Sequence, residues 1–74
     1  MIWEVRKRFK HKGYELKMWH NIDVSGRRVY VVTLESDPYE PIRGVYTQKE
    51  ALADCMQMIA EREAMGAIFK RAGV

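Results

Sequence analysis

Two alternating stretches of sequence, joined by a short glycine turn, constrain the fold more strongly than any other feature. In residues 14–23 the apolar side chains and His20 fall at even positions, and the odd positions are mostly polar. Residues 27–35 are rich in valine, tyrosine and threonine. This pattern is typical of two strands of one sheet. Val24-Ser25-Gly26 suits a three-residue hairpin loop with glycine in the left-handed conformation, and a two-residue Ser25-Gly26 turn is the alternative.

The apolar pattern favours the three-residue loop, because the loop length sets the register of the hairpin. That loop pairs Leu16 with Leu34, Met18 with Val32, and His20 with Tyr30, which makes one face consistently apolar. A slip by one residue would mix the two faces. The register also places Glu15 opposite Glu35, which is mildly unfavourable.

The flanking segments give weaker strand signals. In residues 2–10 Trp3, Val5 and Phe9 alternate with charged residues, but Lys7 breaks the alternation, so we expect at most an edge strand. Two prolines and an Asp-Pro step predict a loop over residues 36–41. Residues 42–46 can form another short strand.

A capping box marks the start of a helix. In Thr47-Gln48-Lys49-Glu50 the threonine hydroxyl can accept from the Glu50 amide while the glutamate returns to Thr47. The helix is expected to end near Met65, and continuation through Gly66 over residues 67–71 is the alternative. Its apolar arc comprises Ala51, Leu52, Cys55, Met58 and Ile59, with Met56 at the edge.

These elements predict an α+β fold in the order β-β-β-β-α. An antiparallel sheet of three to four strands carries one long C-terminal helix on one face. The chain has 74 residues, which allows a single domain over residues 1–74. A chain of this length buries only about 60% of its surface on folding, so one layered core is expected and not a second.

Several functional classes find little support in the sequence. A single cysteine, Cys55, cannot form an internal disulfide, which favours a reducing cytoplasm. No run of apolar residues is long enough for a membrane span, and the N-terminus does not begin a signal peptide. His11, His20 and Cys55 lack metal-ligand spacing, and no phosphate loop or acid–base pair is present. We therefore expect no catalysis, no metal and no cofactor.

The hairpin carries apolar residues on its second face as well. Trp19, Val29 and Val31 lie there, beside Lys17 and Arg27. One helix covers only one side of a small sheet, so Trp19 and Val31 are expected to lie open as a docking patch. The alternative is a cover supplied by Trp3 and Phe9, or by Ile68 and Phe69 at the other end of the chain.

Positive charge is concentrated in the first third of the chain. Residues 1–28 hold eight lysines and arginines against three acids, a net +5, whereas the remainder is −2. Such a segment is either an ordinary solvated face or a surface for an anionic partner. The candidate binding residues are Arg6, Lys7, Arg8, Lys10, Lys12, Lys17, Trp19, Arg27, Val29 and Val31, with Arg28 beside them.

Part of the chain resembles the N-terminal arm-type DNA-binding domains of phage-type integrases. The similarity rests on Gly13-Tyr14, Ser25-Gly26-Arg27-Arg28 and residues 44–51, and it spans Gly13 to roughly Glu63. It implies a three-stranded sheet with one packing helix, and DNA read by the exposed sheet face through Lys17, Trp19, Arg27, Val29 and Val31. Many small phage and bacterial proteins of unassigned role share the same pattern of elements.

Two partner classes follow from these features. The cations and Trp19 suit a nucleic acid, whose phosphates and bases they would contact. Exposed strand edges and the Trp19 patch suit a protein partner, either a second copy of the chain or a host complex bound by a small phage-type regulator such as an anti-CRISPR protein.

Overall fold

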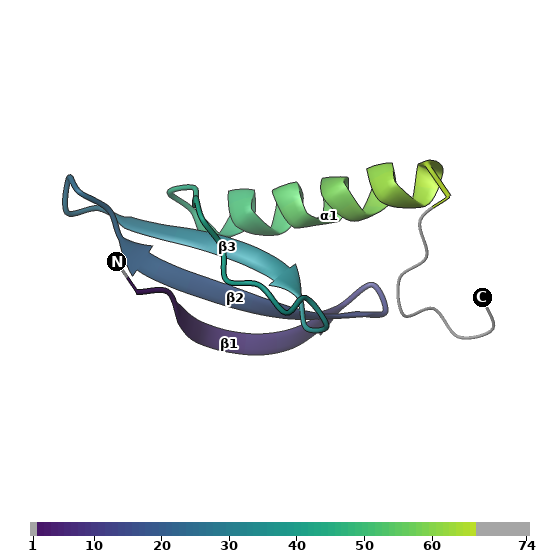
Figure 1. Ribbon diagram of the computed structural model, residues 1–74, viewed down its shortest axis with the longest axis horizontal. Helices are drawn as coiled ribbons and strands as arrows, with labels where there is room; N and C mark the ends of the chain where they lie inside the picture. Colours follow the sequence, from purple (N-terminus) through teal and green to yellow (C-terminus); the bar gives the residue numbers. More distant parts are fainter. Residues whose placement is uncertain (1, 67–74) are drawn as a thin grey trace.

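A computed structural model describes residues 2–66, which form an antiparallel sheet of three strands and one helix (Figure 1). The strands are β1 (Glu4–His11), β2 (Tyr14–Ile22) and β3 (Arg28–Leu34), in the spatial order β1-β2-β3. The helix, α1, spans Gln48–Ala64. The predicted α+β class is confirmed, and the first segment is a strand of the sheet.

The β2–β3 hairpin has the register that the three-residue loop predicts. Leu16 pairs with Leu34 and Met18 with Val32. Asp23 organises the loop between the strands: its carboxylate accepts from the backbone N–H groups of Ser25 (2.9 Å) and Arg27 (3.0 Å). Gly26 adopts a φ of +85°, which a residue with a side chain seldom adopts.

The predicted fourth strand over residues 42–46 is not present. Only Val45 pairs with β3, through two backbone hydrogen bonds to Tyr30 of 2.7 and 2.9 Å. The residue before it, Gly44, lies against Trp3 and Val29 and does not extend the ladder along β3. The segment 35–47 is therefore a connection that touches β3 once on its way to α1.

The predicted cap at Thr47 forms at the start of α1, with the Glu50 carboxylate returning to the hydroxyl of Thr47. The Thr47 hydroxyl accepts from the Glu50 amide (3.1 Å) and donates to the Glu50 carboxylate (2.9 Å). The helix ends at Ala64, one residue before the expected end, and Gly66 follows in the left-handed region with a φ of +86°. The alternative that the helix continues over residues 67–71 lies outside the described residues.

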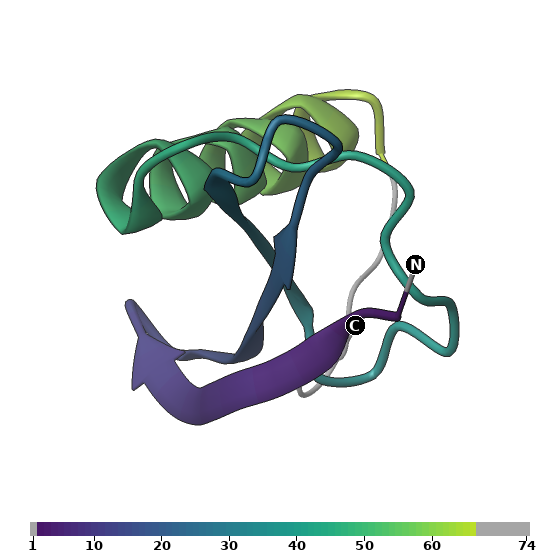
Figure 2. The ribbon, with the colours of Figure 1, turned by 90° about the vertical axis from the view of Figure 1, so that its left-hand side faces the viewer.

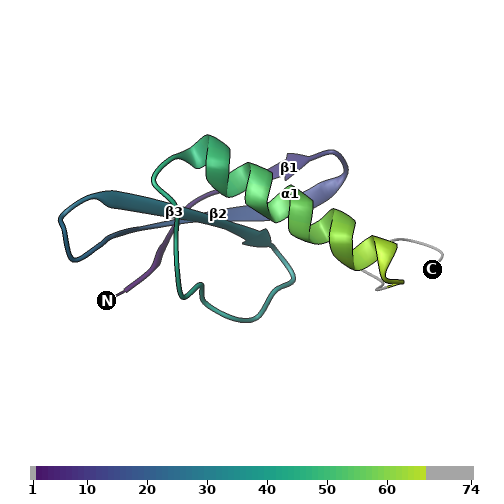
Figure 3. The same cartoon turned by 90° about the horizontal axis from the view of Figure 1, so that it is seen from above.

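The main core lies between the sheet and α1, which crosses the strands obliquely (Figure 3). Leu16, Met18 and Val32 from the sheet pack against Ala51, Cys55 and Ile59, which recur every four residues on one side of the helix. Tyr14 donates a hydrogen bond to Glu63 and so ties the start of β2 to the last turn of α1.

A second, smaller core lies on the opposite side of the sheet, contrary to the expectation of a single one. It consists of Trp3, Trp19 and Val29, with Val5 and Val31 packed against them. Figure 2 shows the segment 35–47 running along a side of the sheet that α1 does not cover. Gly44 of this segment packs closely on the second core, because a Cβ added to Gly44 would lie 2.8 Å from Trp3 and 3.1 Å from Val29.

Candidate binding surface

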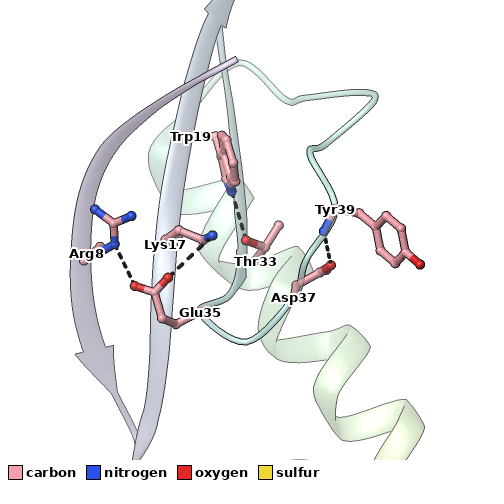
Figure 4. Close-up of polar contacts among 7 residues, drawn as sticks. All are labelled: Arg8, Lys17, Trp19, Thr33, Glu35, Asp37 and Tyr39. Atoms are coloured by element: carbon pink, nitrogen blue, oxygen red, sulfur yellow. Dashed lines mark hydrogen bonds and ion pairs between the residues drawn. The ribbon is translucent and has the colours of Figure 1, made fainter. Parts of the chain in front are cut away.

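The expectation that Trp19 and Val31 form an open patch is wrong. Trp19 retains 8% of its exposure and Val29 retains 6%, while Val31 is half-buried. The Trp19 indole N–H donates to the Thr33 hydroxyl at 2.9 Å, so its polar atom is satisfied as well (Figure 4). The sheet face that was expected to dock a partner is therefore largely closed around this tryptophan.

Trp19 and Val29 are covered by the N-terminal segment and by the connection between β3 and α1. Trp3, itself only 9% exposed, packs against Trp19 and Val29. Phe9, the second residue considered as a cover, instead packs on the helix side. Ile68 and Phe69 lie outside the described residues.

Glu35 neutralises two of the predicted binding residues. Its carboxylate lies 2.7 Å from Arg8 Nε and 3.5 Å from Lys17 Nζ (Figure 4). Lys17 retains 13% of its side-chain exposure, and its ammonium lies 4.9 Å from the centre of the Trp19 ring. Lys17 is thus engaged within the molecule, whereas the Arg8 side chain remains 63% exposed.

Arg27 and Arg28 lie at the other end of the hairpin and have local partners. The Arg27 guanidinium stacks on the Tyr46 ring, 3.8 Å from its centre. Arg28 Nη1 lies 2.7 Å from His20 Nδ1. Because β2 has nine residues, these two arginines lie about 25 Å from the turn at Lys12.

The remaining predicted cations gather on β1 and the turn that follows it. Arg6, Lys7, Arg8, Lys10 and Lys12 are all exposed. Lys7 Nζ lies 5.4 Å from the centre of the Phe9 ring. Within residues 2–66, no ion pair involves Arg6, Lys10 or Lys12. The four of these cations that have no acidic partner within residues 2–66, namely Arg6, Lys7, Lys10 and Lys12, make this strand the main anion-attracting feature of the described surface.

These cations lie on both sides of the sheet. Arg8 pairs with Lys17 and Lys10 with Glu15, so their side chains share the side of Trp19. Lys7 pairs with Met18 and therefore points to the side of α1. Arg6 is the extra residue of a β-bulge between Val5 and Lys7.

The outer edge of β1 is unpaired among the described residues. The backbone N–H and C=O of Tyr30 bond to Val45, so Tyr30 does not bond to β2. Because the direction of these groups alternates along a strand, the odd residues of β3 hydrogen-bond to the odd residues of β2 that face them. The even residues of β2 therefore direct their backbone groups to β1. In β1, the residues that hydrogen-bond to these even residues of β2 include Lys7, opposite Met18, and Phe9, opposite Leu16. Arg8 and Lys10 consequently direct their backbone N–H and C=O groups outward. The edge strand expected from residues 2–10 is therefore confirmed, and four cations on a weakly alternating strand are typical of one.

Metal-ligand groups, the single cysteine and the cavity beside β3 were the remaining places where a site could lie. No group of three or more His, Cys, Asp or Glu within residues 2–66 is arranged to hold a metal ion. Burial, with the charge of Asp37, raises the pKa of the Cys55 thiol to about 11, which keeps it protonated at neutral pH. A cavity of about 150 Å³ lies between β3, residues 43–45 and α1, which is below the usual size of a small-molecule site.

Within residues 2–66, no helix combines the length and apolar character needed to cross a membrane. Comparison with protein-family models, curated proteins and solved structures finds no match for this chain.

Proposed function

We propose that the chain is a small non-catalytic protein-interaction module that binds an acidic partner along β1. The observation that carries the proposal is the placement of exposed cations on both sides of a strand whose outer edge is unpaired. Cations so placed attract an anionic partner and guide its approach.

Two observations favour a protein over a nucleic acid. The sheet face expected to read DNA holds Trp19 and Val29 in a buried cluster, and its Lys17 is paired with Glu35. The cations of β1 project to both sides, so a duplex lying against one side would contact only some of them.

Nucleic-acid binding remains the second candidate, because five exposed cations in seven residues suit a phosphate backbone. On this candidate Lys10 and Lys12 would contact phosphates without reading bases. The strength of binding would then fall steeply with salt and depend little on sequence.

The test compares two labelled probes by fluorescence anisotropy in about 20 mM salt, where charge screening is weak. One is a peptide of about twelve residues in which glutamate alternates with threonine, and the other is a duplex of about 20 base pairs. We expect the peptide to bind more tightly, and the double variant Lys7→Glu/Lys10→Glu to weaken its binding at least about tenfold.

The matched control is Lys49→Glu/Arg62→Glu, which makes the same change of charge at two exposed positions of α1. It should alter peptide binding less than about threefold. Equal losses in both double variants would mean that net charge alone matters, and would overturn the proposal. Tighter binding of the duplex, with the same dependence on Lys7 and Lys10, would replace it with the nucleic-acid candidate.

A further inference from the structure

The outward backbone groups of β1 define how an acidic partner would be held. Arg8 and Lys10 each present one N–H donor and one C=O acceptor along the open edge. The two residues are two positions apart, as are the bonding residues on one side of any β-strand. No backbone group within residues 2–66 bonds to this edge. A strand of another chain would supply the complementary donors and acceptors.

We infer that an acidic, extended segment of a partner protein adds to the outer edge of β1 as a fourth strand of the sheet. The inference rests on the proposed function and specifies its mode of recognition. Main-chain hydrogen bonds would hold the segment, and its side chains would determine which segment is accepted.

The backbone carbonyls separate this mode from binding of a phosphate chain. A phosphate offers hydrogen-bond acceptors but no N–H donors, so it could not bond the outward C=O groups of Arg8 and Lys10, which would remain hydrated, and it would place negative charge beside them. A peptide backbone supplies both kinds of group. The edge therefore matches a polypeptide better than it matches a nucleic acid.

The cations predict where the acids of the added strand lie. Lys7 lies on the side of α1, and Arg8 and Lys10 lie on the side of Trp19. Successive side chains of an added strand point to opposite sides, so aspartate or glutamate on either side meets a cation. Each such cross-strand pair contributes favourably, whereas like charges repel.

The bulge and the turn limit the length of the site. Arg6 interrupts the regular ladder at one end, and the two-residue turn Lys12-Gly13 ends it at the other. The regular platform is therefore Lys7–His11. A second copy of the chain is a poor occupant, because pairing two β1 strands would bring their cations together.

Backbone methylation tests the inference separately from charge. The probe is the Glu-Thr peptide described above, compared with the same peptide N-methylated at four consecutive central residues. Methylation removes N–H donors and adds bulk at the strand edge but leaves the charge unchanged. We expect binding of the methylated peptide to fall at least about tenfold.

Amide hydrogen exchange provides the second measurement. In the free protein the amides of Arg8 and Lys10 should exchange faster than those of Lys7 and Phe9, which face β2. Addition of the unmodified peptide should slow exchange at Arg8 and Lys10 at least about tenfold and leave Lys7 and Phe9 nearly unchanged.

The outcomes distinguish the two proposals. If the unmodified peptide binds and depends on Lys7 and Lys10, but methylation has no effect and the Arg8 and Lys10 amides gain no protection, strand addition is wrong and charge-based docking stands. If the unmodified peptide does not bind, the proposed function and the inference both fail.

Discussion

Arg6 determines which side chains of β1 and of the residues before it point to each side of the sheet. As the extra residue of the bulge, it reverses the alternation, so Trp3 and Val5 face Trp19 while Phe9 faces the helix. In a regular strand of the same sequence with no bulge, Trp3, Val5 and Phe9 would share one side. The bulge therefore allows Trp3 and Val5 to pack against Trp19 while Phe9 packs on the side of the helix.

Asp23 is the residue whose protonation is expected to affect stability most clearly. A hydrogen bond from the Ser25 side chain is the largest influence on its carboxyl, and further bonds from Arg27, Tyr46 and the Ser25 backbone act in the same direction, so its pKa is lowered. Because the pKa is lower in the folded state, the charged form stabilises the fold above its unfolded pKa. That contribution is lost as the pH falls through the lower, folded value.

We therefore expect Asp23→Asn to lower the free energy of unfolding more at pH 7 than at about pH 2, where the wild-type carboxyl is also neutral. Urea denaturation at the two pH values measures the difference. Glu40→Gln, at an exposed position, serves as the control and should show little change at either pH. An effect of Asp23→Asn that is equal at both pH values would contradict the role of the charge.

The helix and the connection that precedes it form for different reasons. α1 begins where Thr47 and Glu50 cap each other, a local interaction that four consecutive residues contain. Residues 42–46 have strand-forming side chains, yet only Val45 reaches β3. The conformation of this segment depends on the packing of Gly44 against Trp3 and Val29, which precedes the start of α1.

Gly44 is where this connection approaches the sheet most closely. A Cβ at this position would lie 2.8 Å from Trp3 Cη2 and 2.9 Å from the Tyr30 carbonyl oxygen, which accepts the bond from Val45. Gly44→Ala should therefore lower the free energy of unfolding by about 1–3 kcal/mol, the usual cost of overpacking.

Urea denaturation followed by tryptophan fluorescence measures this loss, since Trp3 and Trp19 both lie in the affected cluster. Glu40→Ala is the control in the same connection, because Glu40 is exposed. A change at Gly44 as small as that at Glu40 would show that residues 43–45 do not pack on Trp3.

Residues 2–66 form a sheet with a core on each side, and among these residues the strand at one edge is unpaired. β1 lies on the border of the molecule farthest from α1 (Figure 1, Figure 2). An open edge is a hazard for self-association, and cations or a bulge on the edge strand oppose it. β1 has both, so the same charges that suit an acidic partner also keep copies of the chain apart.

Removal of the positive charges of β1 should allow copies of the chain to associate through its unpaired edge. The triple variant Lys7→Thr/Arg8→Thr/Lys10→Thr keeps strand-forming residues but removes the repulsion, and it is expected to self-associate at micromolar concentrations while the wild-type chain remains monomeric. Sedimentation velocity distinguishes the two.

The control is Lys49→Thr/Arg62→Thr, which removes cations from α1 and should remain monomeric. A wild-type dimer that is unchanged in the triple variant would instead place a self-association surface elsewhere.

The amino-acid sequence by itself determined the local and periodic features: the register of the β2–β3 hairpin, the cap at Thr47, the α+β class and the concentration of cations before residue 13. These depend on neighbouring residues or on a repeat of two or about four, which the order of residues displays directly. The tertiary structure alone decided that Trp19 is covered, that residues 42–46 are not a strand, and that the cations fall into two separate groups. Each of these depends on contacts between distant segments, such as Trp3 with Gly44, and a bulge at one residue changes which contacts form.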